Sequence, residues 1–342
     1  MKKLLFLLLL VCYISAHSQE TDPSVKAATL KYNAAVKLIE AGNYSEAIVA
    51  LSKCIELNPK LDKAYLLRGK CKFASKEVKQ SILDFNSATK INPTNGEAYF
   101  CLGYAILKTD TSKVTIEPFS LAITNGYEDY QVYYQRAVVR ALKKDFTNAI
   151  FDYNKAIEKK PNFALAFYDR GYAKLQTKDF STALVDFQQA SYLDTSIVEA
   201  YINQGYCFMM NNDYVNANKS LSKAISYSSS NVMALNNRGV ASFKTGDFKS
   251  SLTDLGQGLK IEKNNYKILN NIGVAQTKVK NTKVANDAFN LAISSNPQSP
   301  EPYLNRGFLK ESAGDLKGAC ADWTMASKLG NAAATEYIKE CK

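Results

Sequence analysis

Tyr65-Leu66-Leu67-Arg68-Gly69 is followed 34 residues later by Tyr99-Phe100-Cys101-Leu102-Gly103, and the same step recurs to the end of the chain. Four later copies keep the spacing without insertions: Phe167-Tyr168-Asp169-Arg170-Gly171, Tyr201-Ile202-Asn203-Gln204-Gly205, Leu235-Asn236-Asn237-Arg238-Gly239 and Tyr303-Leu304-Asn305-Arg306-Gly307. A fixed period of this length is the sequence signature of stacked supersecondary units, none of which buries its apolar face alone. The 342 residues therefore predict a repeat array rather than two or three separate globular domains.

Counting position 1 from residue 28 gives nine repeats with one internal pattern. They are 28–61, 62–95, 96–129, 130–163, 164–197, 198–231, 232–265, 266–299 and 300–333. In most of them position 8 is Gly or Ala, positions 20 and 27 are small, position 24 is large and apolar, and position 32 is often Pro. Positions 4, 7, 8 and 11 share one face of a first helix, and positions 20, 24 and 27 share one face of a second. Each repeat should therefore form a pair of helices whose small residues allow close contact.

The second repeat shows the pattern in full. It has Tyr65, Gly69, Ser81, Phe85, Ala88 and Pro93 at the key positions. This pattern resembles the tetratricopeptide repeat, which has an aromatic residue followed by Leu-Gly, Ala, Phe, Ala and Pro at these spacings. The resemblance covers about nine-tenths of the chain. It implies an all-α, right-handed superhelical solenoid of about nine helix-turn-helix repeats.

Segments at both ends of the array follow from the same spacing. Residues 19–27 precede the first repeat as a short lead-in. Residues 334–342 continue the step, with Tyr337 at position 4 and Cys341 at position 8. This last segment is expected to be a capping helix, because the end of a repeat array has a neighbour on one side only.

The turns between paired helices contain Gly followed by Asp or Asn. Examples are Gly-Asp-Phe at 246–248, Gly-Asp-Leu at 314–316 and Gly-Asn-Tyr at 42–44, where the Asp or Asn is placed to cap the second helix. The third repeat departs from this pattern: 109–113 replaces the Gly-Asp turn, and Pro118 enters the second helix. We expect a distorted or kinked second helix there, with the register of the next repeat kept.

The first 18 residues have the composition of an export signal. Met1-Lys2-Lys3 is basic, the run 4–14 is apolar, and residues 15–18 supply small side chains for a cleavage site. The apolar run is too short to remain as a membrane anchor. We therefore expect residues 1–18 to be removed and the protein to be periplasmic or secreted. Lipid attachment at Cys12 is the alternative, although the residue before it is not small.

The mature chain lacks the residues that most enzymes need. Signal removal deletes two lysines and no acid, so the net charge becomes 41 − 32 = +9, and it also deletes His17, the single histidine. Without histidine there is no Ser-His or Cys-His pair and no His-containing zinc site. The chain has no CxxC pair and no glycine-rich phosphate loop, and its Ser-x-x-Lys match at 87–90 lies on a second helix. We expect no enzyme activity, no metal and no cofactor.

Positions 7 and 23 vary together. Position 7 is Arg and position 23 is Asp in the same five repeats, and the other four repeats have neither. The pairs are Arg68–Asp84, Arg136–Asp152, Arg170–Asp186, Arg238–Asp254 and Arg306–Asp322. The matching indicates charge-assisted hydrogen bonds between the two helices of one repeat, and a row of acidic sites is the alternative interpretation.

Six cysteines remain after signal removal, in a compartment that permits disulfides. Cys101 has no evident partner. Cys320 lies on the second helix of the last repeat and Cys341 in the cap, so a Cys320–Cys341 disulfide is the best candidate, because it would fasten the terminal helix. Cys54, Cys71 and Cys207 occupy small, inward-facing positions of their repeats, so we expect them to be buried free thiols.

Two rows of side chains are candidates for ligand binding. In the family that the chain resembles, first helices line an inner groove with positions 2, 5, 6, 9, 12 and 13. Position 6 carries amides, which can hold the backbone of an extended peptide, although ordinary repeats also have Asn there: Gln135, Asn203, Asn237, Asn271 and Asn305. Positions 5 and 9 carry aromatic residues, which mark binding surfaces but also pack between neighbouring helices: Phe100, Tyr104, Tyr134, Tyr168, Tyr172 and Tyr206.

These features predict a non-enzymatic scaffold or assembly factor of the cell envelope that binds a protein or an extended peptide in its groove. Binding of envelope glycan, with sugars stacked on the tyrosines, is the alternative. The family's clamp for chaperone tails needs Lys at position 5 and Asn at position 9 of one repeat, and no repeat has both. The lysines are spread without a dense basic run, which favours acidic partners or envelope surfaces over nucleic acid.

Overall fold

The computed structural model describes residues 22–109, 111–112 and 115–341, and all regular secondary structure in these ranges is helical. This confirms the all-α fold class. The predicted signal segment 1–18, including Cys12, lies outside the described residues. No helix within the described ranges has both the length and the apolar character that crossing a membrane requires.

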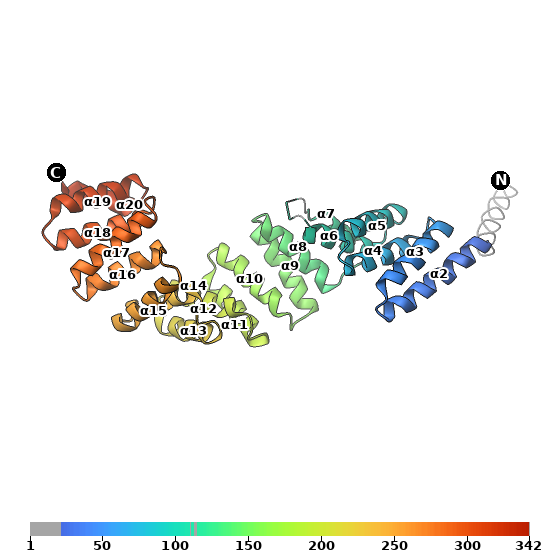
Figure 1. Cartoon of the computed structure of the whole chain (residues 1–342), viewed down its shortest axis with the longest axis horizontal. Coiled ribbons are helices and arrows are strands. Elements are labelled where there is room, and N and C mark those ends of the chain that lie inside the picture. Colours follow the sequence, from blue (N-terminus) through green and yellow to red (C-terminus); the bar gives the residue numbers. More distant parts are fainter. Residues whose placement is uncertain (1–21, 110, 113–114, 342) are drawn as a thin grey trace, which may run out of the picture. The chain divides into compact units, whose positions relative to one another are not determined.

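The chain divides into two compact units, Met1–Pro161 and Asn162–Lys342, whose helices are labelled in Figure 1. The first unit contains α2 (Pro23–Glu40), α3 (Tyr44–Leu57), α4 (Asp62–Ala74), α5 (Val78–Ile91), α6 (Gly96–Thr109), α7 (Glu117–Thr124), α8 (Tyr130–Leu142) and α9 (Phe146–Lys159). The second unit contains α10 (Ala164–Gln176), α11 (Phe180–Leu193), α12 (Val198–Met210), α13 (Tyr214–Tyr227), α14 (Val232–Lys244), α15 (Phe248–Ile261), α16 (Tyr266–Lys278), α17 (Thr282–Ser295), α18 (Pro300–Ser312), α19 (Leu316–Lys328), α20 (Ala332–Ile338) and the 3-10 helix η1 (Lys339–Cys341).

Helices pair in the order that a helix-turn-helix solenoid requires. Within each unit a first helix packs against the second helix of its own repeat, and that second helix packs against the first helix of the following repeat. From the second repeat onward, every first helix begins at position 1 of the repeat defined by the sequence. The lead-in is partly helical, because α2 begins at Pro23, where Asp22 accepts a hydrogen bond of 2.8 Å from the Ser24 backbone N–H.

Large side chains at position 24 form the centre of each repeat. All nine are at most 2% exposed: Leu51, Phe85, Phe119, Tyr153, Phe187, Leu221, Leu255, Phe289 and Trp323. Each lies opposite a buried Gly or Ala at position 8 of the first helix. At Gly307 an added Cβ would lie 2.5 Å from Trp323 Cδ1, and at Gly205 it would lie 2.5 Å from Leu221 Cγ. The small residue at position 8 therefore sets how closely the two helices approach.

We predict that Gly307→Ala destabilises the protein by about 1–3 kcal/mol, because the methyl group overpacks the fixed ring of Trp323. Gly256→Ala is the matched control. Gly256 also lies inside a helix, but an added Cβ meets nothing within 4 Å. This substitution should stabilise the protein by about 0.5–1 kcal/mol, since alanine has the higher helix propensity. Urea denaturation followed by circular dichroism measures both, and equal effects of the two substitutions would contradict the close contact.

Position 15 begins the turn between paired helices and adopts positive φ in both units. Glycine occupies it in Gly42, Gly246 and Gly314, with φ between +78° and +86°. Lysine or asparagine adopts the same conformation elsewhere, as in Lys144 and Asn212, with φ of 62° and 60°. The turn geometry therefore persists without the glycine that made it recognisable in the sequence.

Aspartate at position 16 caps several second helices. Asp247, for example, accepts a hydrogen bond of 3.0 Å from the Ser250 backbone N–H. The expected cap at Asn43 is wrong: Asn43 occupies the N-cap of α3 but makes no side-chain hydrogen bond to it. Its ψ of 64° resembles that of the aspartate caps, so the residue takes the turn conformation without the capping contact.

The second helix of the third repeat is shortened rather than kinked. Helix α7 begins at Glu117 and has eight residues, whereas the other second helices of this unit have fourteen. Pro118 lies in its first turn, where backbone N–H groups make no intrahelical hydrogen bond. A proline, which lacks the N–H, therefore does not break the helix there. Helix α8 still begins at Tyr130, position 1 of the next repeat, so the register is kept.

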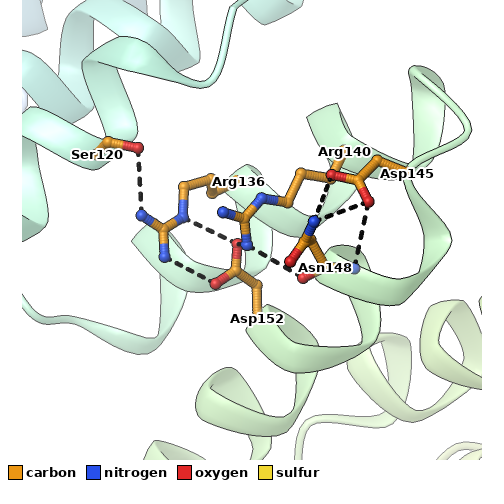
Figure 2. Close-up of polar contacts among 6 residues, drawn as sticks. All are labelled: Ser120, Arg136, Arg140, Asp145, Asn148 and Asp152. Atoms are coloured by element: carbon orange, nitrogen blue, oxygen red, sulfur yellow. Dashed lines mark hydrogen bonds and ion pairs between the residues drawn. The ribbon is translucent and has the colours of Figure 1, made fainter.

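The predicted arginine–aspartate pairs lie at hydrogen-bond distance, as Figure 2 shows for Arg136 and Asp152. Arg136 Nε and Nη2 donate to the two carboxylate oxygens at 2.9 and 2.8 Å. Its third nitrogen, Nη1, donates to Ser120 Oγ on α7 at 3.2 Å. Arg140 Nη1 donates to the same carboxylate at 2.6 Å. One buried carboxylate thus joins α8 to α9, and its arginine reaches α7 as well.

The same arrangement recurs in the other four pairs. Each arginine Nη2 lies 2.6–2.8 Å from the first carboxylate oxygen, and each Nε lies 2.8–3.0 Å from the second. In three of these repeats a lysine at position 11 also contacts the carboxylate: Lys72, Lys174 and Lys310. The sequence comparison of positions 7 and 23 missed this second cation. The bidentate geometry makes the pairs structural contacts rather than a row of free acidic sites.

We predict that Arg136→Ala and Asp152→Ala are non-additive. Each substitution leaves a buried charge with fewer partners, so the double variant should be less destabilised than the sum by about 1–3 kcal/mol. Thermal or urea denaturation of the four proteins in the cycle measures this difference. The exposed pair Lys155–Glu158, at 2.8 Å, serves as the control and should show no measurable coupling. Additive effects at Arg136 and Asp152 would contradict the contact.

The C-terminal cap is held by aromatic packing and a disulfide. Tyr337 lies with its ring centroid 4.8 Å from Phe308 and 5.3 Å from Trp323. Cys320 on α19 and Cys341 in η1 form a disulfide with a Cα–Cα distance of 5.7 Å. Residues 334–342, expected as one capping helix, comprise most of α20 followed by the 3-10 turn.

We predict that reduction of the Cys320–Cys341 disulfide destabilises the cap by about 3 kcal/mol, because it reopens a loop of 21 residues in the unfolded chain. Hydrogen exchange of the α20 amides should accelerate on reduction, while exchange in α14 stays unchanged. The Cys320→Ser/Cys341→Ser double variant is the control, since its exchange should no longer respond to reductant. A cap whose exchange is the same with and without reductant would contradict the prediction.

Candidate functional site

The first helices of the second unit present a continuous face, called here the first-helix face and formed by positions 2, 5, 6 and 9. Helices α12, α14, α16 and α18 contact one another in sequence along it. The regular spacing of the repeats places equivalent side chains of neighbouring helices side by side. The amides expected at position 6 lie half-buried on this face at Asn203, Asn237, Asn271 and Asn305.

The amides of α14, α16 and α18 are joined by hydrogen bonds. Asn305 Nδ2 donates to Asn270 Oδ1 at 2.9 Å, and Asn271 Nδ2 donates to Asn236 Oδ1 at 2.9 Å. Within helices, Asn270 donates to Asn271 at 3.5 Å and Asn236 to Asn237 at 3.3 Å. These five side chains, called here the amide chain, fix one another's orientation. A primary amide has two N–H donors and two acceptor lone pairs, so bonding in the chain leaves capacity for a ligand.

Position 5 was the part of this site that the sequence analysis missed. Asn236 and Asn270, both at position 5, accept the hydrogen bonds from the next repeat, whereas the sequence predicted amide ligands at position 6 only. The signal was the doubled Asn-Asn at 236–237 and again at 270–271, one period apart. Asn203 follows the same rule, because it donates to the hydroxyl of Tyr168, position 5 of the preceding repeat, at 3.4 Å. Position 5 of the sixth repeat is the apolar Ile202, which offers no acceptor to Asn237.

Two hollows open beside the amide chain, one on each side of Lys267. The Asn271 hollow has a volume of about 300 Å³ and is lined by Asn236, Tyr266, Lys267, Asn270, Asn271, Ser299, Glu301 and Pro302. The Asn237 hollow has a volume of about 280 Å³ and is lined by Val232, Met233, Asn236, Asn237, Glu262, Asn265 and Lys267. Each hollow combines amides with both a basic and an acidic side chain. The pair therefore forms a mixed polar and apolar surface across three repeats.

The predicted aromatic row divides into buried and exposed members. Phe100 is a core residue rather than a groove residue, because it is 9% exposed and its ring lies 5.3 Å from Tyr127 and 6.3 Å from Phe119. Phe119 belongs to α7, and Tyr127 lies in the loop between α7 and α8. Tyr104 is half-buried, 5.6 Å from Phe73.

The remaining tyrosines are two half-buried and two exposed residues. Tyr134 and Tyr168 are half-buried, with their rings 5.9 Å from Tyr153 and 5.7 Å from Phe187 at the centre of their own repeats. Burial raises the pKa of Tyr168 above its ordinary value. Tyr172 is 46% and Tyr206 is 36% exposed. These last two are the members of the row most available to a ligand, while Gln135 on α8 is half-buried.

The free thiols do not add nucleophiles to either unit. Burial raises the pKa of the Cys101 and Cys207 thiols to about 12. It also raises the pKa of Cys54 and Cys71. Reactive cysteines need a thiolate at neutral pH, and burial here keeps these groups protonated. Packing is therefore their role.

Comparison with known proteins relates the chain to one family. A sequence model described as tetratricopeptide repeat matches residues 28–61 and 130–163, the first and fourth repeats. No curated protein sequence matches the chain. Among solved structures, YrrB, described as a TPR protein with an unusual peptide-binding site, is 20% identical with a TM-score of 0.51, over 54% of this chain and 96% of YrrB.

Two further structures have similar folds. The C-terminal part of a TPR repeat-containing protein from Cytophaga hutchinsonii is 18% identical with a TM-score of 0.54, over 70% of this chain and 99% of that one. PilW, described as a widely conserved type IV pilus biogenesis factor, is 18% identical with a TM-score of 0.54, over 62% and 97%. Identities this low show the shared fold. Residues 28–61 and 130–163 therefore match the tetratricopeptide repeat, and the chain has the fold of a tetratricopeptide-repeat solenoid.

Proposed function

We propose that this protein is a non-enzymatic scaffold that holds an extended segment of a partner protein on the first-helix face of repeats seven to nine. The observation that carries the proposal is the amide chain with its two adjacent hollows. The general ability of tetratricopeptide proteins to bind proteins and peptides supports the same class of function, and YrrB is a peptide-binding example with this fold.

Amides suit the backbone of an extended segment. A peptide in extended conformation exposes alternating N–H and C=O groups, and a row of oriented primary amides offers partners for both. Because the amides of Asn271 and Asn305 are already held by Asn236 and Asn270, little side-chain entropy is lost when a peptide binds. The amide chain would therefore hold many sequences by their backbones.

The hollows would select among those sequences. Lys267 borders both, and Glu301 borders the Asn271 hollow, where its carboxylate accepts a hydrogen bond of 2.6 Å from Ser299 Oγ. Met233, which is 62% exposed, lines the Asn237 hollow. A partner segment with an acidic residue near Lys267 and an apolar residue near Met233 fits this surface, and acidic partners agree with the chain's positive net charge.

The proposed setting is the cell envelope. The basic, apolar and small-residue pattern of residues 1–18 favours export, with cleavage after Ser18 or, as the alternative, lipid attachment at Cys12. The Cys320–Cys341 disulfide suits an oxidising compartment. PilW, a pilus biogenesis factor, is an assembly factor with this fold. An exported scaffold or assembly factor is consistent with all three observations.

A glycan ligand is the second candidate, because Tyr172 and Tyr206 expose their rings on first helices of the same unit. Exposed aromatic rings provide flat apolar surfaces for sugars. The two candidates use different residues. Peptide binding depends on the amide chain, whereas glycan binding depends on these two tyrosines.

Decapeptides that bind the protein are first selected from a random peptide array. We predict that the Asn271→Ala/Asn305→Ala variant binds them about tenfold more weakly than wild type, because two hydrogen bonds of about 0.5–1.5 kcal/mol each are removed. Gln188→Ala is the matched control, since it removes an exposed amide from a second helix, α11. Fluorescence anisotropy with labelled peptides measures the affinities, and N-methylation of the peptide backbone should weaken binding in the same way.

Unchanged affinity in the double variant would contradict the proposed site. Loss of affinity in Gln188→Ala would place the peptide-binding site on the second helices. Titration of soluble peptidoglycan fragments tests the glycan candidate, which requires shifted resonances of Tyr172 and Tyr206 and weaker binding by Tyr172→Ala/Tyr206→Ala.

A further inference from the structure

A repeated contact is incomplete in the seventh repeat. In four of the five repeats with an Arg–Asp pair, the buried carboxylate has a second cation from position 11. The contacts are Lys72 to Asp84 at 2.8 Å, Arg140 to Asp152 at 2.6 Å, Lys174 to Asp186 at 2.8 Å and Lys310 to Asp322 at 2.9 Å. Figure 2 shows the complete arrangement, with Arg136 and Arg140 on one carboxylate.

In the seventh repeat position 11 is Ser242, which is too short to reach the carboxylate as a lysine does. Its hydroxyl instead makes a long hydrogen bond of 3.4 Å to Asn218 Oδ1 on α13. Asp254 keeps its bidentate contact with Arg238, at 2.8 Å to each oxygen. Its side chain is 6% exposed, as buried as its counterparts. Among the residues that the structure describes, this carboxylate thus has one cation in contact, where four equivalent carboxylates have two.

The missing side chain leaves a hollow between α13, α14 and α15, called here the Asp254 pocket. It has a volume of about 570 Å³ and is lined by Asn218, Ser222, Arg238, Ser242, Asp247, Lys249, Ser250, Thr253 and Asp254. Besides the carboxylates, the lining supplies hydroxyl and amide oxygens, which accept hydrogen bonds from an ammonium group. All of these residues belong to the second compact unit.

The pocket lacks the excess positive charge of its equivalents. Its four charged lining residues, Arg238, Lys249, Asp247 and Asp254, sum to zero, whereas each complete cluster carries one positive charge more than its carboxylate neutralises. An added ammonium group would therefore give the seventh repeat the charge state that its equivalents have. Because the carboxylate is shielded from bulk water, this attraction is stronger than that of an exposed acid.

We infer that the Asp254 pocket binds a primary ammonium group, carried by a free alkylamine or by a lysine side chain of a partner. The chain itself provides the template, since Lys72, Lys174 and Lys310 hold their ammonium groups 2.8–2.9 Å from the equivalent carboxylates. The bound nitrogen occupies the corresponding place near Asp254 Oδ2, and its alkyl stem leads out along Ser242.

Lys249 borders the pocket and is exposed, so it is the nearest internal competitor. Among the other repeats with an Arg–Asp pair, the second and ninth also have lysine at position 18, as Lys79 and Lys317. Both are exposed, and in those repeats the carboxylate is contacted from position 11. A lysine at position 18 is therefore not the residue that completes this contact. The pocket also shares no lining residue with the two hollows of the first-helix face.

The test is a titration followed by ¹H–¹⁵N NMR at constant ionic strength. The probes are n-butylammonium chloride and the tripeptide Gly-Lys-Gly acetylated at its N-terminus. Potassium chloride is the control for a cation without an alkyl stem, and N-acetylated Gly-norleucine-Gly is the control for an alkyl stem without an ammonium group. Wild type should show saturable shifts of the Asn218, Ser242 and Thr253 amides. Ser242→Lys supplies the missing cation from within, so it should fold normally and bind the ammonium probes at least about tenfold more weakly. Ser242→Ala keeps the space open and should retain binding.

Saturation by both ammonium probes assigns the pocket to primary ammonium groups of free alkylamines and of side chains alike. Saturation by n-butylammonium alone assigns it to free alkylamines. Saturation by Gly-Lys-Gly alone assigns it to a lysine side chain of a partner. The inference is overturned if neither probe saturates, or if Ser242→Lys binds as wild type does. Ser242→Lys leaves the amide chain unchanged, so it should bind the decapeptides as wild type does. Loss of ammonium binding with unchanged decapeptide binding therefore separates the Asp254 pocket from the proposed peptide site.

Discussion

The contact between a small residue at position 8 and a large residue at position 24 is the constraint on which the rest of the structure depends. A glycine at position 8 lies against the position-24 side chain in seven repeats, and every position-24 side chain is at most 2% exposed. This contact sets the separation of the two helices, and the separation in turn decides which other side chains meet across it. An arginine at position 7 reaches an aspartate at position 23 because the neighbouring residues, 8 and 24, have already brought the backbones together. Charge-assisted bonds then fix a geometry that packing has defined.

The arginine contacts link repeats as well as helices. Arg68, Arg136 and Arg238 each donate through Nη1 to a serine on the preceding second helix, at 3.0–3.2 Å. A buried ion pair alone is weak evidence of stability, because desolvation offsets much of the attraction. Here the same guanidinium also joins three helices, so its removal would leave donors and acceptors unpaired on each of them. The contact therefore contributes to the register of the stack more clearly than to its overall stability.

Periodicity was sufficient to predict the helix pairs, the starts of the first helices from the second repeat onward, and the partners Cys320 and Cys341, because each depends on a position counted along one regular step. The predictions failed where the step is kept but the surroundings change. Phe100 is buried because the rings of Phe119 and Tyr127 pack against it, and neither contact is visible from position 5 alone. Asn236 and Asn270 at position 5 accept hydrogen bonds from position 6 of the next repeat. Comparing one position at a time through the repeats cannot reveal this contact, because it joins two different positions of neighbouring repeats. The Asp254 pocket is defined by an absent side chain, which becomes visible only when the other four carboxylates show what normally fills it.

Helix α14 shows how one repeat carries two surfaces without sacrificing the fold. Asn236 and Asn237 lie on the first-helix face, while Arg238 and Ser242 lie against α13 and α15. Successive helical residues point about 100° apart, so positions 5 and 6 are directed away from positions 7 and 11. The contact of Gly239 with Leu255 holds the helix between these surfaces. Because that contact uses neither the amides nor Ser242, both surfaces are free to vary while the repeat stays in register. Departures from the repeat at positions that do not set helix separation are therefore where binding specificity can arise.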